Sequence, residues 1–531
     1  MMNRISVITL LAFGLILTGD GAAARGGDIP NYDVLIKGGT IFSGEDPPFR
    51  GEVAIRGDRI AYVGRKAPHR ARRVIDARGA VVAPGFIDPH AHVDDALTSD
   101  IPAARLVLPF LLQGVTTAII GVDGGGEHEV GPRLASPTGK PVGINFATYV
   151  GFSPVRIDVM GESDRQPTGA ELARMRAMVA RAMCAGAIGF STGLFYAPQS
   201  FARSAEVIAL AREAAARGGI FDSHIREEGR NGGGWQAAID EVVDVGRAAG
   251  LPVHIAHLKA LGVDAHGDSA AIIAAVERAR SSGVRVTADQ YPWTASSTML
   301  HAVLIPRWAL EGGVDALRRR IAEPAALARI KADMRERLRQ VGGAQSLALY
   351  ADKAKLRGER LDAYARRRNL DPIDAALLLL SGELVRVVSY NMIEADVEAF
   401  MRRPWVMTSS DASLSHPRYY GSFAHKYGHY VRLRSTLGLR EFIERSSRLT
   451  ADTLGLVGRG RLRAGAFADV LVFDPGRYAA RATFDAPELF ATGVRTVLVN
   501  GEIAVEDGRP TGVAAGRGLA HTPPRQTCSA S

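Results

Sequence analysis

The sequence predicts an α/β fold, a (β/α)8 TIM-like barrel with a small β-sandwich domain formed by the N- and C-terminal segments. In the middle of the chain, eight short apolar segments alternate with stretches of helical periodicity. Such alternation gives a parallel sheet with right-handed crossovers, and eight units close a barrel. At both ends of the chain, short alternating segments are separated by turn residues instead, which is typical of antiparallel hairpins.

The small β domain is predicted to combine residues 31–83 with residues 463–509. Apolar and polar residues alternate near the start of the chain, on both sides of the turn Gly57-Asp58. Near the other end, the dipeptide Asn500-Gly501 between two apolar segments is a strong signal for a type I′ hairpin. Strands from both ends therefore form one domain, into which the rest of the chain is inserted.

The barrel is predicted over residues 84–462, with candidate strands at 81–87, 115–121, 144–150, 187–191, 220–224, 253–257, 284–290 and 405–411. A doubly wound sheet is disfavoured, because the first strand–helix turn carries no G-x-G-x-x-G motif. Residues 306–370 are rich in Arg, Ala, Leu and Glu, which predicts a helical insertion between the seventh and eighth strands. The insertion either covers the barrel mouth or decorates its periphery, and an extra strand is expected at 385–390.

The composition is that of an ordinary globular protein, with 47% apolar and 23% charged residues. The net charge of +9 comes from scattered Lys and Arg, without the basic stripe and interleaved aromatic residues of a nucleic-acid-binding protein. The two cysteines, Cys184 and Cys528, are expected to be unpaired and are too few for a Cys-rich zinc site. The tail 510–531, rich in Gly, Ala and Pro, is expected to be flexible.

The first residues have the pattern of a signal peptide. Arg4 precedes the apolar core 7–17, and the small residues Ala22-Ala23-Ala24 follow it, which predicts cleavage after Ala24. The alternative is an uncleaved anchor, although the apolar core is too short to span a bilayer. We therefore expect a periplasmic or secreted protein that has no stable membrane insertion after processing.

The stretch from Gly85 to His92 carries the first chemical signal. His90 and His92 follow an apolar strand and point the same way, because strand side chains alternate with period two. Imidazole suits zinc and similar divalent ions. Taken alone, a His-x-His pair is more often two solvent-exposed histidines.

The same residue types end the other predicted strands, where barrel active sites lie. The candidate metal ligands are His90, His92, Asp123, His224, His257 and Asp411. Their convergence predicts a site for one or two divalent ions. His254 lies an odd number of residues before His257, which predicts the opposite face of the strand and a structural role.

These residues and their surroundings resemble the amidohydrolase superfamily and, within it, the N-acyl-D-amino-acid deacylases (D-aminoacylases). The resemblance covers about residues 32–509 and is strongest at 85–95, 186–199, 223–229, 291–298 and 416–423. The family fold is a (β/α)8 barrel with a small β domain, in agreement with the pattern above. The resemblance differs at Asp123, where the family has a Cys ligand, and at Gly151-Phe152, where many members have Gly-His.

The resemblance implies a role for each matching residue. Positions such as His224 and His257 hold the tighter zinc, and His90, His92 and Asp411 form a weaker second site. Asp411 also serves as general acid and base. The residues that hold the substrate are Lys259, Tyr291, Ser297 and Arg418.

The chemistry of these side chains agrees with that implication. A bound metal lowers the pKa of water toward ~7, and a carboxylate such as Asp411 takes a proton and returns it to the leaving amine. Arg418 offers a bidentate fork to a substrate carboxylate. The predicted cofactor is Zn²⁺, one or two ions, with other divalent metals tolerated because Asp123 is harder than Cys.

The predicted function is removal of the acyl group from N-acyl-D-amino acids or related acylated amino acids or dipeptides. One alternative is a cyclic-amide hydrolase of the hydantoinase or dihydroorotase type, which usually bridges two metals with a carboxylated Lys, and the predicted strand 187–191 has no Lys. A second alternative is a catalytically inactive barrel that binds acylated peptides. The sequence does not predict the oligomeric state.

Overall fold

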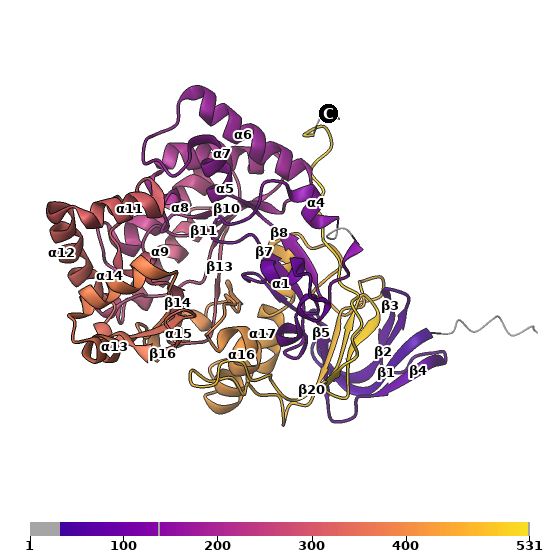
Figure 1. The fold of residues 1–531 in the computed structure, drawn as a ribbon. Helices are drawn as coiled ribbons and strands as arrows, with labels where there is room; N and C mark the ends of the chain where they lie inside the picture. Colours follow the sequence, from indigo (N-terminus) through magenta and orange to yellow (C-terminus); the bar gives the residue numbers. More distant parts are fainter. Residues whose placement is uncertain (1–31, 136–138, 529–531) are drawn as a thin grey trace, which may run out of the picture.

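The computed structural model describes residues 32–135 and 139–528 and confirms the predicted architecture of a barrel with a β domain built from both chain ends (Figure 1). The predicted signal peptide lies outside the described residues. Among the helices of the described part, none is both long and apolar enough to cross a membrane.

The barrel wall consists of short parallel strands in the predicted places. They are β6 (Phe86–Asp88), β7 (Val115–Ile120), β8 (Asn145–Thr148) with its continuation β9 (Val150–Gly151), β10 (Gly189–Gly193), β11 (Ile220–His224), β12 (Val253–Ile255), β13 (Val286–Gln290) and β18 (Val406–Thr408). Neighbours pair in the order β6-β7-β8 and β9-β10-β11-β12-β13-β18. A parallel bridge between Ala91 and Ala412 joins the first strand region to the last.

Helices between the strands surround the barrel (Figure 1). The longer ones are α5 (Phe152–Met160), α6 (Gly169–Cys184), α7 (Ser204–Ala216), α8 (Gly234–Ala249), α9 (Ser269–Ser281), α15 (Glu394–Met401), α16 (Arg418–His425) and α17 (Leu439–Arg445). Shorter ones are α1 (Asp94–Thr98), α2 (Pro102–Arg105), α3 (Leu108–Leu111), α4 (Val130–Leu134) and α18 (Arg448–Thr453). In α7 the residues Val207, Leu210, Ala211 and Ala214 are buried at helical spacing, as its amphipathic pattern predicts.

The first predicted strand divides between the two domains. Residues Val81–Pro84 form β5, which pairs with β1 and β19 of the terminal sheet, and only β6 belongs to the barrel. Gly85 separates the two, and a Cβ there would lie 2.2 Å from the Thr116 hydroxyl oxygen. Its glycine therefore allows one apolar run to pass from one sheet into the other.

The terminal sheet has nine strands, in the order β22-β21-β20-β19-β5-β1-β2-β3 with β4 paired to β1. Its remaining members are β1 (Tyr32–Ile41), β2 (Phe49–Arg56), β3 (Arg59–Gly64), β4 (Ala71–Asp76), β19 (Val470–Phe473), β20 (Val494–Val499), β21 (Glu502–Glu506) and β22 (Arg509–Pro510). Asn500 and Gly501 join β20 to β21 with φ angles of 48° and 86°. Two positive φ angles are the signature of the predicted type I′ turn.

The insertion is larger and more mixed than the helical segment that the sequence predicts. It contains an antiparallel sheet of β14 (Ser296–Met299), β15 (Leu347–Ala351), β16 (Leu356–Arg360) and β17 (Arg386–Ser389), in the order β14-β17-β15-β16. Around it lie α10 (Leu300–Leu304), α11 (Gly313–Ala322), α12 (Pro324–Gln340), α13 (Leu361–Arg368) and α14 (Pro372–Gly382). The extra strand expected at 385–390 is confirmed by β17. The strand β15 was missed because Ala and Leu favour helices locally, and here tertiary pairing decides.

The predictions for the cysteines and for the tail are wrong. Cys184, at the end of α6, forms a disulfide bond with Cys528, 344 residues further along, with a Cα–Cα distance of 5.6 Å. The described part of the tail, residues 510–528, is tied to the barrel by backbone hydrogen bonds, from Gly516 N to Val142 O at 2.8 Å and from Leu519 N to Phe146 O at 2.7 Å. A Cβ at Gly516 would lie 2.0 Å from Ile144 O, so this glycine permits close packing rather than flexibility.

Candidate metal centre and active site

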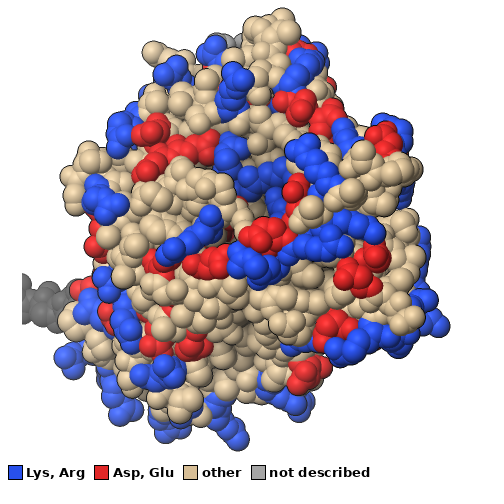
Figure 2. Space-filling model, turned by 90° about the vertical axis from the view of Figure 1, so that its left-hand side faces the viewer, with Lys and Arg blue, Asp and Glu red and all other residues tan. Residues whose placement is uncertain are grey.

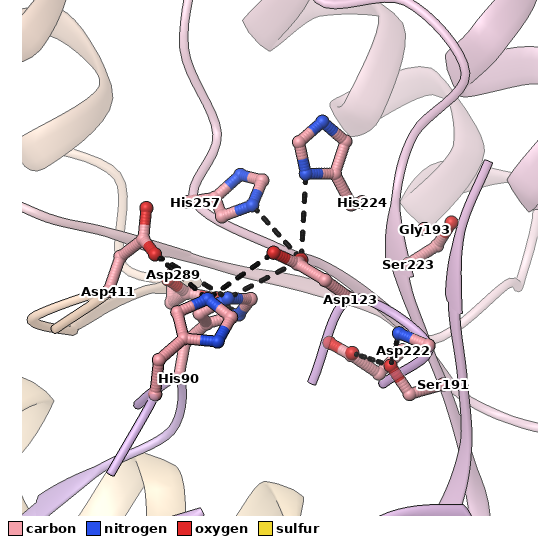
Figure 3. Close-up of polar contacts among 12 residues, drawn as sticks. His90, Asp123, Ser191, Gly193, Asp222, Ser223, His224, His257, Asp289 and Asp411 are labelled. Carbon is pink, nitrogen blue, oxygen red and sulfur yellow. Dashed lines mark hydrogen bonds and ion pairs between the residues drawn. The ribbon is translucent and has the colours of Figure 1, made fainter. Parts of the chain in front are cut away.

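The six predicted metal ligands converge at the carboxyl ends of the barrel strands. His90 and His92 follow β6, Asp123 follows β7, and the other three ligands, His224, His257 and Asp411, come from β11 and from the loops after β12 and β18. Figure 3 shows the Asp123 side chain between His90 on one side and His224 and His257 on the other.

Asp123 is the centre of the cluster. Its Oδ1 atom lies 3.2 Å from His257 Nε2, 3.4 Å from His90 Nε2 and 3.5 Å from His224 Nδ1. Its Oδ2 atom lies 3.4 Å from His92 Nε2. Two sets of three ligands result, each with two imidazoles and the shared carboxylate, and the ligand atoms of each set lie within 4.8 Å of one another. A carboxylate shared in this way has the geometry to bridge two metal ions.

The backbone at three of these residues adopts a conformation that side chains usually avoid. Asp123, His257 and Asp411 have φ angles of 54°, 34° and 47°. Non-glycine residues in this left-handed region are uncommon and carry strain of order 1–3 kcal/mol each. Such strain accumulates at functional sites, where a side chain must be turned toward a shared centre.

The donor set fits divalent metal ions. Neither ring nitrogen of His90 or of His224 makes a hydrogen bond with any other described residue, although both imidazoles are buried. Buried imidazoles without partners are unfavourable unless something else uses their lone pairs. Two imidazoles and a carboxylate oxygen suit zinc and its neighbours in the first transition series.

The carboxylates of the cluster also favour positive charge at its centre. Burial on its own lowers the pKa of His92, but hydrogen bonds to Asp123 and Asp411 outweigh it and raise that pKa to about 10. For His257, burial and the Lys259 ammonium lower the pKa, and Asp123 and Glu228 raise it more, again to about 10. Without metal the carboxylates therefore hold protons on the imidazoles of His92 and His257, and a divalent ion would supply positive charge while releasing those protons.

Glu228 belongs to the site and was missed as a functional residue. Its Oε1 atom lies 3.1 Å from His257 Nδ1, and its Oε2 atom lies 3.6 Å from His224 Nε2. A carboxylate at the outer nitrogen of a metal-binding imidazole fixes the ring orientation and raises its basicity. The sequence signal that could have identified Glu228 was its position, four residues after His224, which is the last residue of β11.

His254 lies inside the barrel, which contradicts the prediction that it faces away. Its Nε2 atom is 2.9 Å from Asp289 Oδ2, and that oxygen lies 4.0 Å from His90 Nδ1. The period-two argument failed because β12 ends at Ile255, so the alternation does not extend to His257. His254 is in neither ligand set, and through Asp289 it supports the His90 side of the centre.

Asp411 lies between the candidate metal ligands His90 and His92 and the guanidinium group of Arg418. Its Oδ1 atom is 3.3 Å from His92 Nε2, and its Oδ2 atom is 2.7 Å from Arg418 Nη1. Burial by itself raises the pKa of Asp411, but the Arg418 guanidinium and the hydrogen bond from His92 outweigh it and hold that pKa well below its usual range. The carboxylate is therefore ionised. A hydrogen bond of 2.9 Å from its own backbone N–H to His90 O fixes it beside the ligands.

A cavity of about 630 Å³ lies over the cluster, and the predicted substrate residues line it. The Tyr291 hydroxyl and the Ser297 hydroxyl have no hydrogen-bond partner among the described residues. The Lys259 ammonium is instead engaged, donating to Glu228 Oε1 at 2.5 Å. Residues Arg337, Gln340 and Val341 form another part of the wall, so the insertion covers the barrel mouth rather than its periphery.

The chain matches known proteins over most of its length. The model of the amidohydrolase family matches residues 73–122 and 144–505. A D-aminoacylase from Alcaligenes xylosoxydans xylosoxydans is 32% identical over 523 residues, 93% of this chain and 99% of that protein. An N-acyl-D-glutamate deacylase from the same organism is 36% identical over 497 residues, 88% of this chain and 93% of that protein.

Solved structures agree with these relatives. A D-aminoacylase structure that describes a binuclear metal centre matches with a TM-score of 0.79 and 31% identity, covering 92% of this chain and 100% of that one. N-acyl-D-glutamate deacylase from Bordetella bronchiseptica, complexed with zinc and a phosphonate inhibitor, matches with a TM-score of 0.79 and 32% identity, covering 93% and 100%. The chain belongs to the amidohydrolase family and is a metal-dependent, D-aminoacylase-like hydrolase.

Proposed function

We propose that this protein hydrolyses N-acyl-D-amino acids. The observation that carries the proposal is the group of polar side chains facing the cavity beside the ligands. Arg418 is next to Asp411, and the hydroxyls of Tyr291 and Ser297 have no partner among the described residues. These donors suit a substrate carboxylate whose scissile amide lies over the metal ligands. The names of the relatives, D-aminoacylase and N-acyl-D-glutamate deacylase, support the same substrate class.

Each residue then has a defined task. Divalent ions, when bound, activate water and polarise the carbonyl group to be attacked. Asp411, which is held ionised, accepts a proton from the attacking water and donates it to the leaving amine. Arg418 holds the substrate carboxylate beside Asp411, and Glu228 holds the rings of His224 and His257 in orientation.

We further propose zinc as the natural metal, with one or two ions per chain. His224 and His257 form one ligand pair, His90 and His92 form the other, and Asp123 takes part in both. A carboxylate in the shared position tolerates manganese, cobalt or iron better than a thiolate would. Metal analysis of the purified protein, followed by chelation and re-addition of single metals, tests both the identity and the number of ions.

Export to the periplasm or the exterior is proposed from two independent features. The sequence pattern of residues 1–24 is one, and the disulfide bond between Cys184 and Cys528 is the other. Disulfide bonds persist in oxidising compartments and are rare in the cytosol. N-terminal sequencing of the mature protein from cell fractions tests this, with Arg25 expected as the first residue. A cytosolic protein that retains residues 1–24 would contradict it.

The alternatives make different predictions for one assay. The purified protein, with its metal content measured, is given N-acetyl-D-amino acids, their L-enantiomers, hydantoin and dihydroorotate. We expect turnover of the D-enantiomers only. Turnover of the cyclic amides instead would establish a cyclic-amide hydrolase, although β10 contains no Lys to carry a bridging carbamate. Negligible metal content and no turnover would leave a binding barrel.

A further inference from the structure

A second cavity adjoins the active-site cavity on the side of the insertion. Its volume is about 920 Å³, and it lies between the sheet of the insertion and the loop 484–489. Three residues, Met299, Arg386 and Leu414, line both cavities. The two spaces are therefore neighbours separated by a few side chains. Figure 2 views the face that carries the insertion, where Lys and Arg side chains gather with acidic ones around a hollow.

Arg386 stands at this boundary without a partner. It lies on β17, opposite Met299 in the strand register, and is half-buried. Among the described residues, none forms a hydrogen bond or an ion pair with its guanidinium group. Burial and the nearby positive charge of Arg418 lower the pKa of Arg386, and the Asp411 carboxylate offsets only part of this effect. A half-buried guanidinium without an ion-pair partner in contact is unfavourable on its own and is stabilised by an anion.

The other arginines of the second cavity are already engaged. Arg357 pairs with Asp352 at 2.8 Å, and Arg360 lies 3.9 Å from the ring centroid of Tyr390. Asp485 and Glu488 also line the cavity, but neither forms an ion pair with Arg386. Of the three arginines that line this cavity, only Arg386 has a guanidinium group with neither a hydrogen bond nor an ion pair to another described residue, and it lies at the boundary with the active site.

The walls suit a carbon chain leading to that cation. Met299 and Leu414 form the boundary beside Arg386, and Tyr390 and Phe484 pack together further out, with ring centroids 4.9 Å apart. Leu414 is 60% exposed, so its side chain is free to move aside. A substrate that passes this boundary would meet apolar groups along its length and one guanidinium group at its charged end.

We propose that Arg386 binds a second carboxylate of the substrate, carried on an extension that passes from the active-site cavity toward the second cavity. This rests on the proposed deacylase function and narrows it to dicarboxylate substrates. The second carboxylate has two sources, the end of a dicarboxylic acyl group or the side chain of an acidic amino acid. Both present the same chemistry to Arg386.

Matched substrate pairs distinguish the two sources. N-succinyl-D-leucine and N-succinamoyl-D-leucine differ only in the charge at the acyl end, and N-acetyl-D-glutamate and N-acetyl-D-glutamine differ only in the charge of the side chain. For the wild-type protein we expect kcat/KM to favour the charged member of one pair by about tenfold or more, as for a charge-assisted hydrogen bond. The pair that shows the preference identifies the source.

Two variants and a control test the residue. Arg386→Gln should bring the ratio of kcat/KM between the charged and neutral substrates close to one. Arg386→Lys should keep part of this preference, and its remaining activity also shows that a variant at this position folds. Arg357→Gln, which removes an arginine already paired with Asp352, should keep the wild-type ratio. A ratio near one in the wild type for both pairs, or a preference that persists in Arg386→Gln, would overturn the proposal.

Calorimetric binding of the same four compounds separates this proposal from the proposed reaction. Absence of turnover of N-acetyl-D-leucine would reject the deacylase function, and binding would still report on Arg386. Equal affinities for charged and neutral members in the wild type would then overturn the role of Arg386 independently. A preference for charged members that is lost in Arg386→Gln would support it.

Discussion

The mouth of the barrel and the terminal sheet are built in opposite ways. The core of the terminal sheet is apolar, with fully buried residues such as Val53, Ile55 and Val472 on strands that are paired along most of their length. The barrel mouth holds buried imidazoles without hydrogen-bond partners and left-handed residues such as Asp123 and Asp411. We therefore expect stability to depend mainly on regions such as the sheet, and we expect the strain at the mouth to serve the placement of functional side chains.

Asp411→Asn should cause the largest loss of activity with the smallest change of shape. Removing the charge takes away the proton carrier and leaves Arg418 without its ion-pair partner. We expect kcat to fall by at least ~10², the effect of losing a positioned acid–base group. Steady-state kinetics alongside thermal unfolding measures both quantities, and a near-normal kcat would reject the assigned role.

Asp123 combines a left-handed backbone conformation with a place in both candidate ligand sets. Asp123→Ala should lose bound metal and most activity, and Asp123→Cys should retain zinc and some turnover, because a thiolate is also a good zinc ligand. Asp123→Gly removes the carboxylate as well, but glycine accepts the φ angle of 54° without strain. We therefore expect the metal-free Gly variant to be more stable than the Ala variant by about 1 kcal/mol.

Metal analysis and denaturant unfolding of these three variants complete that comparison. Full metal occupancy with normal rates in Asp123→Ala would show that Asp123 is not a metal ligand and instead stabilises the turn in which it lies. Equal stability of the Ala and Gly variants would show that the left-handed backbone at this position carries no strain.

The disulfide bond lies far from the strained mouth. α6 ends at Cys184, shortly before β10 begins, which is the end of the barrel opposite to the ligands. The double variant Cys184→Ser/Cys528→Ser should lose about 2–4 kcal/mol of unfolding free energy, the usual range for such a cross-link. Its kcat should be unchanged at 25 °C. Urea unfolding with and without reductant measures this, and an unaltered midpoint on reduction would contradict it.

The sequence predicted the parts of the molecule that follow local rules. The alternation of strands with helices predicted the barrel, because it is a periodic pattern. The His and Asp residues at strand ends were predicted to converge, because the carboxyl ends of barrel strands lie at one face. Glu228 lies four residues past the end of β11, where strand alternation no longer predicts the direction of a side chain, and its role depends on how His257 is turned after β12 ends. The disulfide bond joins residues 344 apart, a contact that only the folded tail creates. In the sequence, the glycines of that tail are typical of a flexible segment. In the fold, a glycine such as Gly516 allows the backbone to pack closely against the barrel.

Arg418→Lys should produce a smaller effect at the mouth. Lysine keeps the charge but not the planar fork, so KM for carboxylate substrates should rise by about tenfold or more. Amide-capped analogues of the same substrates should be little affected. Kinetics on both series measure the difference. Equal losses on both series would show that pairing with Asp411, and not substrate binding, is the function of Arg418.

The smallest predicted effects come from a matched pair of core substitutions, Ile55→Val and Ile255→Val. Both isoleucines are fully buried, Ile55 in the terminal sheet and Ile255 on β12, two residues before His257. Each change removes one methylene group, so each should lower the unfolding free energy by about 1 kcal/mol. Only Ile255→Val should lower kcat/KM as well, because a small displacement of His257 disturbs a site that needs accurate geometry. Chemical denaturation and steady-state kinetics measure the two effects separately. An equal loss of activity in Ile55→Val would show that the sheet and the mouth are coupled, and that stability and function are not divided between them.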